Sequence, residues 1–160
     1  IFLESDLFFA GNRPAVNVGL SVSRVGGAAQ TKAMKKASGS LRVDLAQFRE
    51  MEVFTQFSSD LDENTKAELQ YGKCLMELLK QPQNHPLSMA RQVITLWTAT
   101  HKALVDVDVK DLKKVQMDML DYIDSRYPEV GRELEETKVL SDELGEKILK
   151  IAEEFLKKSR

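Results

Sequence analysis

Residues 31–57 read TKAMKKASGSLRVDLAQFREMEVFTQF, and this stretch determines the fold class that we expect for the chain. Its apolar residues recur at steps of three and four, the spacing of one helix face: Met34, Ala37, Leu41, Leu45 and Phe48. Gly39 interrupts the pattern and weakens a helix by about 1 kcal/mol relative to alanine, so we expect a break there. The pattern predicts an interrupted helix that ends near Phe57.

The helical spacing continues from residue 63 to the end of the chain. Further inner stripes are formed by Leu69, Gly72, Met76 and Leu79; by Ala90, Val93, Ile94 and Trp97; by Leu112, Val115, Met119 and Ile123; and by Leu144, Ile148, Ile151 and Phe155. Prolines at 82, 86 and 128 stop helices, and a short helical piece is expected around residues 129–136. The chain is therefore predicted to be mainly α, with a bundle of about five helices over residues 31–160.

Residues 1–30 differ from this pattern, because short apolar runs alternate there with glycine and proline. The runs predict a few short strands, which do not bury their faces alone, so we expect a strand-rich stub from the edge of a larger sheet. Within it, residues 13–27 are expected to be extended and to carry the Arg24 guanidinium at their tip. A planar, permanently charged group suits a phosphate, although Arg24 as a purely structural strand-end residue is the alternative.

Composition excludes several classes of protein. The 160 residues carry a net charge of −2, which does not indicate a nucleic-acid protein, and no apolar run approaches the roughly 20 residues of a membrane span. Cys74 is the only cysteine, so no internal disulfide is expected. His85 and His101 lack a second ligand at metal spacing, and no metal site is expected. The first residue, Ile1, lies inside an apolar run, which suggests a piece of a longer protein.

Four stretches resemble one known family, the alpha subunits of F-type ATP synthases. They are GNRPAVNVGLSVSRVG at 11–26, AAQTKAMKK at 28–36, LRVDLAQFRE at 41–50 and FSSDLD at 57–62. The resemblance implies that residues 1–30 are the carboxyl-terminal end of a nucleotide-binding α/β domain and that residues 31–160 are a helical domain. The 160 residues contain no G-x-x-x-x-G-K-[ST] phosphate loop, so we expect this chain alone to be inactive.

The resemblance also implies a role for Arg24 in an alternating hexamer of alpha and beta subunits. Catalytic sites lie mainly on beta, and alpha inserts into them the arginine that matches Arg24. Its guanidinium would stabilise the charge that spreads over the γ-phosphoryl oxygens in the transition state. Such an arginine finger accelerates related reactions by about 10³–10⁵-fold.

A second, regulatory nucleotide site is implied on alpha itself, where ATP or ADP binds with Mg²⁺ without turnover. The positions that match the surroundings of its adenine base are Phe8, Arg13, Pro14, Gln81 and Gln83. Arginine and aromatic planes stack on a base, and glutamine amides hydrogen-bond to its edge. Taken without the family, Phe8 reads as sheet core and the glutamines as ordinary loop residues. Pro82 departs from the glycine that the family often has there, and no tight nucleotide binding is expected of the chain alone.

The FSSDLD stretch matches a loop that faces the central gamma subunit in this family. Ser58, Asp60 and Asp62 are the residues expected to meet that shaft, although the two aspartates also suit the capping of the next helix. The family is attached peripherally to the cytoplasmic face of the bacterial membrane, or to the matrix face of the mitochondrial inner membrane. Two other interpretations stay open: a helical interaction module without nucleotide chemistry, and a subunit of a related rotary ATPase.

Overall fold

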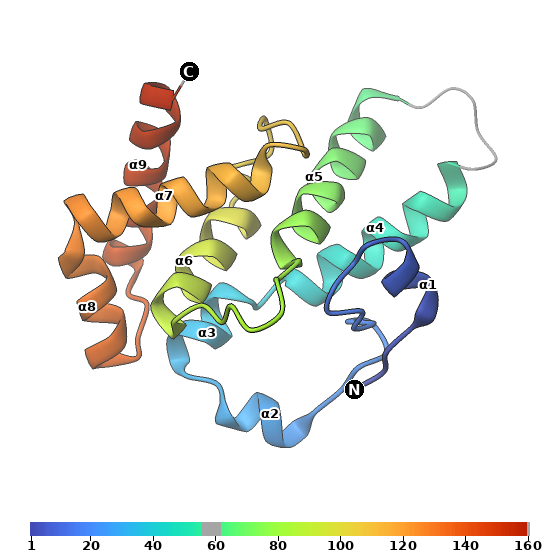
Figure 1. Cartoon of the computed structure of the whole chain (residues 1–160), viewed down its shortest axis with the longest axis horizontal. Helices are drawn as coiled ribbons and strands as arrows, with labels where there is room; N and C mark the ends of the chain where they lie inside the picture. The colour runs from blue at the N-terminus through green and yellow to red at the C-terminus, as the bar shows by residue number, and fades with distance from the viewer. Residues whose placement is uncertain (56–61, 160) are drawn as a thin grey trace.

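The computed structural model describes residues 1–55 and 62–159, and these residues fold mainly into α-helices, as expected (Figure 1). In chain order the helices are α1 (Ser5–Phe9), α2 (Arg24–Ala29), α3 (Lys32–Ala37), α4 (Leu41–Thr55), α5 (Glu63–Leu79), α6 (Met89–Thr100), α7 (Leu112–Arg126), α8 (Pro128–Thr137) and α9 (Asp142–Ser159).

Side chains at the helix starts explain several of these boundaries. The hydroxyls of Thr31 and Ser88 accept hydrogen bonds from backbone N–H groups three residues on, at 3.1 and 3.3 Å, and they cap α3 and α6. The predicted break falls at Gly39, between α3 and α4. Pro128 opens α8, where its missing N–H costs no helical hydrogen bond. The predicted end near Phe57 lies outside the described residues.

Helix α6 lies at the centre of the helical part and contacts α3, α5, α7, α8 and α9. Figure 1 shows α7 crossing the central helices, with α8 and α9 on one side and α4 on the other. Ile94 of α6 is fully buried, as are Leu120 of α7 and Ile148 of α9. Trp97 Nε1 donates to the carbonyl oxygen of Gly145 at 3.0 Å, where α6 and α9 approach each other closely. The predicted inner stripes therefore converge on one core.

The strand-rich stub expected over residues 1–30 is not seen. Among the described residues the only strand-like pairing there is an isolated antiparallel bridge between Leu3 and Val16. The stretch 13–27 is not extended throughout either, since Arg24 begins α2. Strands need neighbouring strands for their backbone hydrogen bonds, and without them local helical bonds satisfy the same groups.

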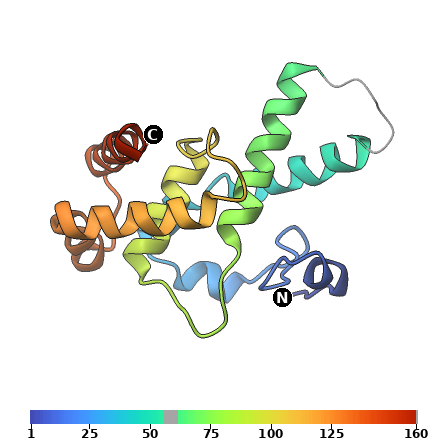
Figure 2. The same ribbon diagram turned by 45° about the horizontal axis from the view of Figure 1, so that its top comes forward.

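Residues 1–30 leave several large apolar side chains exposed. Ile1 is 84% exposed, Phe9 82% and Val25 81%, whereas the helical part encloses its apolar stripes. Figure 2 shows this segment on the same side of the molecule as the loop that joins α5 to α6. None of the described helices is both long enough and apolar enough to cross a bilayer.

Candidate functional site

The structure brings together three of the five residues expected around an adenine base. The Arg13 guanidinium carbon lies 4.1 Å from the centroid of the Phe8 ring, within cation–π range. The backbone N–H of Gln81 donates to the carbonyl oxygen of Arg13 at 2.8 Å. Residues far apart in sequence therefore meet where the amino-terminal segment touches the α5–α6 loop, and the Phe8 side chain is 45% exposed there.

The other two residues expected around the base, Pro14 and Gln83, form no hydrogen bond or ring contact with the three residues above among the described residues. Pro14 follows a cis peptide bond from Arg13. It lines a small cavity of about 130 Å³, which Arg13, Arg49 and Leu79 also line. Gln83 is exposed in the α5–α6 loop, and the described part of the chain gives its side chain no hydrogen-bond partner. Gln83 thus lies two residues from Gln81 in the loop, and no hydrogen bond joins its side chain to the cluster among the described residues.

A buried asparagine fixes the amino-terminal segment against the helices. Asn17 is only 5% exposed, and its amide donates to Glu4 Oε1 at 2.5 Å. Its carbonyl oxygen Oδ1 accepts from the Leu20 backbone N–H at 3.0 Å and from Arg49 Nη1 at 2.6 Å. Because Arg49 belongs to α4, these bonds join the segment to the helical part. Asn17 was not among the residues predicted for a site, although a polar residue inside the apolar run 16–22 is a signal that the sequence contains.

Arg24 lies on a separate element from the base cluster. It is the first residue of α2, whose start is capped by a bond from the Gly26 N–H to the Ser23 hydroxyl at 2.9 Å. Its side chain is exposed and forms no hydrogen bond or ion pair within the described part of the chain. The guanidinium is therefore exposed, and no carboxylate within residues 1–55 and 62–159 holds it.

Of the residues expected to face a central shaft, only Asp62 lies within the described residues, and Ser58 and Asp60 lie outside them. Asp62 is the N-cap of α5. Its carboxylate accepts from the Thr65 hydroxyl at 2.6 Å and from the Thr65 N–H at 3.0 Å, and these bonds lower the pKa of Asp62. The capping role expected for this residue is confirmed.

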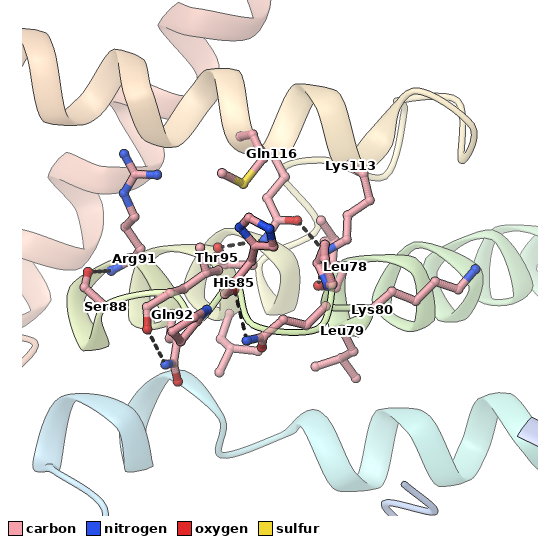
Figure 3. A pocket seen from close by; sticks show the side chains of 16 residues that line it. Leu78, Leu79, Lys80, His85, Ser88, Arg91, Gln92, Thr95, Lys113 and Gln116 are labelled. Atoms are coloured by element: carbon pink, nitrogen blue, oxygen red, sulfur yellow. Dashed lines mark hydrogen bonds between the residues drawn. The ribbon is translucent and has the colours of Figure 1, made fainter. Parts of the chain in front are cut away.

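A larger cavity of about 770 Å³ lies between the end of α5, the α5–α6 loop, α6 and α7 (Figure 3). Lys113 Nζ donates to the Leu78 carbonyl oxygen at 3.0 Å and to Gln116 Oε1 at 2.9 Å. Gln116 is 1% exposed, and its Nε2 donates to Thr95 Oγ1 at 3.1 Å. Burial lowers the pKa of Lys113, whose ammonium has no carboxylate within ion-pair distance in the described part of the chain.

Two residues with reactive side chains, Cys74 and His101, lie in the helical part. Burial raises the pKa of the Cys74 thiol to about 11, which makes it an unreactive core residue. The His101 ring packs against Trp97 at an interplanar angle of 42°, with ring centroids 3.9 Å apart. In the ranges that the structure covers, no three metal-binding side chains gather at one point.

Comparison with known proteins identifies the family. Residues 30–155 match the family described as "ATP synthase alpha/beta chain, C terminal domain". The chain belongs to this family. It is 54% identical over 157 residues to the ATP synthase subunit alpha of Clostridium botulinum (strain Eklund 17B / Type B). The aligned region covers 98% of this chain and 31% of that relative. The corresponding proteins of Clostridium kluyveri and Clostridium acetobutylicum are 49% and 46% identical over the same shares of both chains.

The chain therefore spans about a third of the length of these ATP synthase alpha subunits. The family's carboxyl-terminal domain accounts for the helices from α3 onward, and it includes Gln81 and Gln83. Phe8, Arg13, Pro14 and Arg24 precede the matched range but lie within the region that aligns with the alpha subunits. The candidate base cluster thus combines residues from both sides of the boundary near residue 30.

Proposed function

We propose that this chain acts in the alpha subunit of a rotary, proton-translocating ATP synthase. Residues 1–30 would complete a nucleotide-binding domain, and residues 31–160 would form the helical domain beside it. The subunit would bind ATP or ADP with Mg²⁺ without turning it over. The 160 residues have no phosphate loop, so the phosphates and Mg²⁺ would be held by other parts of the longer protein.

The observation that carries the nucleotide proposal is the meeting of Phe8, Arg13 and Gln81. A guanidinium 4.1 Å from an exposed ring offers two planar groups beside one another, and the 2.8 Å backbone bond to Gln81 fixes the loop next to them. An adenine base presents a π-face for such groups and a polar edge for amides such as those of Gln81 and Gln83. Pro14 would restrict the backbone at this point.

Arg24 is proposed as the arginine finger that enters the catalytic site of an adjacent beta subunit. Its exposure and its lack of a carboxylate partner among the described residues support this, because a guanidinium already paired would have to break that pair first. Beside a γ-phosphoryl group it would stabilise charge that develops in the transition state. Since it comes from the neighbouring subunit, it would also make the chemistry depend on how the two subunits are arranged.

The remaining partners follow from the same proposal. Alpha and beta subunits would alternate in a ring, and the segment containing Ser58, Asp60 and Asp62 would face the central gamma subunit. Asp62 is exposed while it caps α5, so capping and contact with basic residues of a shaft are compatible. The complex would be attached peripherally to the cytoplasmic face of a bacterial membrane.

The experiment that tests the proposal is Arg24→Lys in the full-length subunit, assembled with its partners. We expect steady-state ATP turnover to fall by about three to five orders of magnitude, because lysine keeps the charge but loses the planar, two-pronged geometry. Nucleotide affinity at the catalytic sites should change little, which separates a transition-state role from a binding role.

A matched control is Arg126→Lys, which replaces an exposed arginine in the last turn of α7. It should leave turnover unchanged, since it keeps a positive charge where the helix favours one. If Arg24→Lys also left turnover unchanged, Arg24 would be structural, and the helical interaction module without nucleotide chemistry would be the better interpretation.

A further inference from the structure

The 770 Å³ cavity between α5, α6 and α7 has the size of a small-molecule site, since such sites range over about 300–1,000 Å³. It differs from the base cluster, because the two share only residues at the start of the α5–α6 loop. Leucines from three segments give it an apolar lining, namely Leu78, Leu79, Leu87 and Leu96. Figure 3 shows Lys113 and Gln116 reaching into this space from α7.

Lys113 is the cation of this lining that has no carboxylate within ion-pair distance in the described part of the chain. An ammonium group has three N–H donors, and the structure assigns two of them, to Leu78 O and Gln116 Oε1. Neither acceptor carries a full negative charge. A half-buried cation with one donor unassigned therefore lies in an apolar space, where an anion would be bound more strongly than in water.

The other two strong cations of the lining are already neutralised. Arg91 pairs with Asp121 and Asp124, with Nη2 at 2.6 Å from Asp121 Oδ1, and Lys80 Nζ lies 2.6 Å from Glu77 Oε2. An anion entering the cavity would consequently bind at Lys113 rather than at either of these groups. The leucines would remain available for an apolar body attached to that anion.

We propose that this cavity binds a small organic monocarboxylate, with its carboxylate on the Lys113 ammonium and its apolar body against the leucines of α5 and α6. The proposal needs no nucleotide chemistry and is independent of the function proposed above. A single charge is required, since only one unpaired cation faces the cavity in the part of the chain that the structure describes.

The test is calorimetric titration of the full-length subunit with sodium octanoate. We expect saturable binding at one site, and we expect octanamide, which has the same body without the charge, to bind at least about tenfold more weakly. Lys113→Met removes the charge at similar length and should weaken octanoate binding by the same factor. Lys114→Met is the matched control, because Lys114 is exposed one position along α7, and it should leave binding unchanged.

A second variant tests the cavity without changing Lys113, in case Lys113→Met does not fold. Met117 also lines the cavity and is 40% exposed, so Met117→Trp adds bulk from the surface of α7 and should weaken octanoate binding without changing helicity. The proposal is overturned if octanoate does not bind saturably, or if octanamide and octanoate bind equally well. Equal binding of octanoate to the wild-type and Lys113→Met proteins would overturn it too.

Discussion

Gly72→Ala is a stringent test of how α4 and α5 pack. An added Cβ at Gly72 would lie 2.0 Å from Phe48 Cδ2 and 2.6 Å from Phe48 Cβ, and both distances are far below van der Waals contact. Rotating the Phe48 ring would relieve the first contact but not the second, because the backbone of α4 fixes its Cβ. The two helices must therefore separate, at a core position where Phe48 is only 5% exposed.

The magnitude follows from two opposing terms. Alanine in place of a mid-helix glycine stabilises by about 1 kcal/mol, and overpacking a core costs about 1–3 kcal/mol. Because the clash involves a Cβ that no rotamer change can move, the upper end applies, and we expect a net destabilisation of about 2 kcal/mol. The control is Gly131→Ala in α8, where the nearest atom, Asp124 Oδ1, is 3.8 Å from the new Cβ. That variant should gain only the roughly 1 kcal/mol by which alanine stabilises a helix relative to glycine.

Urea unfolding of the chain, followed by circular dichroism, measures both variants under the same conditions. The two alanine variants should differ in free energy of unfolding by about 3 kcal/mol, with wild type between them. If Gly72→Ala were as stable as Gly131→Ala, the close approach of α4 and α5 would be refuted.

Two further predictions concern pH and hydrogen exchange. Lys158, Tyr127 and Tyr122 donate to the Glu154 carboxylate and hold its pKa at about 2, below the ordinary 4.5. This stabilisation is complete above pH 4.5 and is lost as the pH falls toward 2, so Glu154→Gln should flatten the dependence of Tm on pH in that range; an unchanged profile would contradict the assignment. Amides of residues 1–30 should exchange fastest in the monomeric chain, because side chains such as Phe9 and Val25 are exposed, and slow exchange there would count against this.

The helices could be predicted because their signals are local. Apolar spacing and the stops at Gly39, Pro82 and Pro128 depend on a few neighbouring residues, and the observed ends agree with them closely. Strands cannot be predicted from local sequence in the same way, because an apolar run such as 16–22 forms a strand only if a partner strand lies beside it. In the described residues that run forms one bridge, between Val16 and Leu3.

The site was predictable only in part. Spacing alone gives no reason to place Gln81 against Arg13, and that pairing came from the family resemblance. Gln116 could have been found from the sequence, because it falls on the inner stripe that Leu112 and Met119 define on α7. A polar residue on an apolar stripe requires a buried partner, and the partners here are Thr95 and Lys113.

The α5–α6 loop connects the two candidate sites. Gln81 is among the residues that line the large cavity, and its backbone N–H donates to the carbonyl oxygen of Arg13 at 2.8 Å. A ligand that displaced this loop from the cavity side would stretch that bond and move Arg13 relative to Phe8. If occupancy of one site changes the affinity at the other, the factor must be the same in each direction, because binding free energies are reciprocal. If both proposals hold, loop 80–88 would be the element through which the helical domain responds to a nucleotide bound beside it.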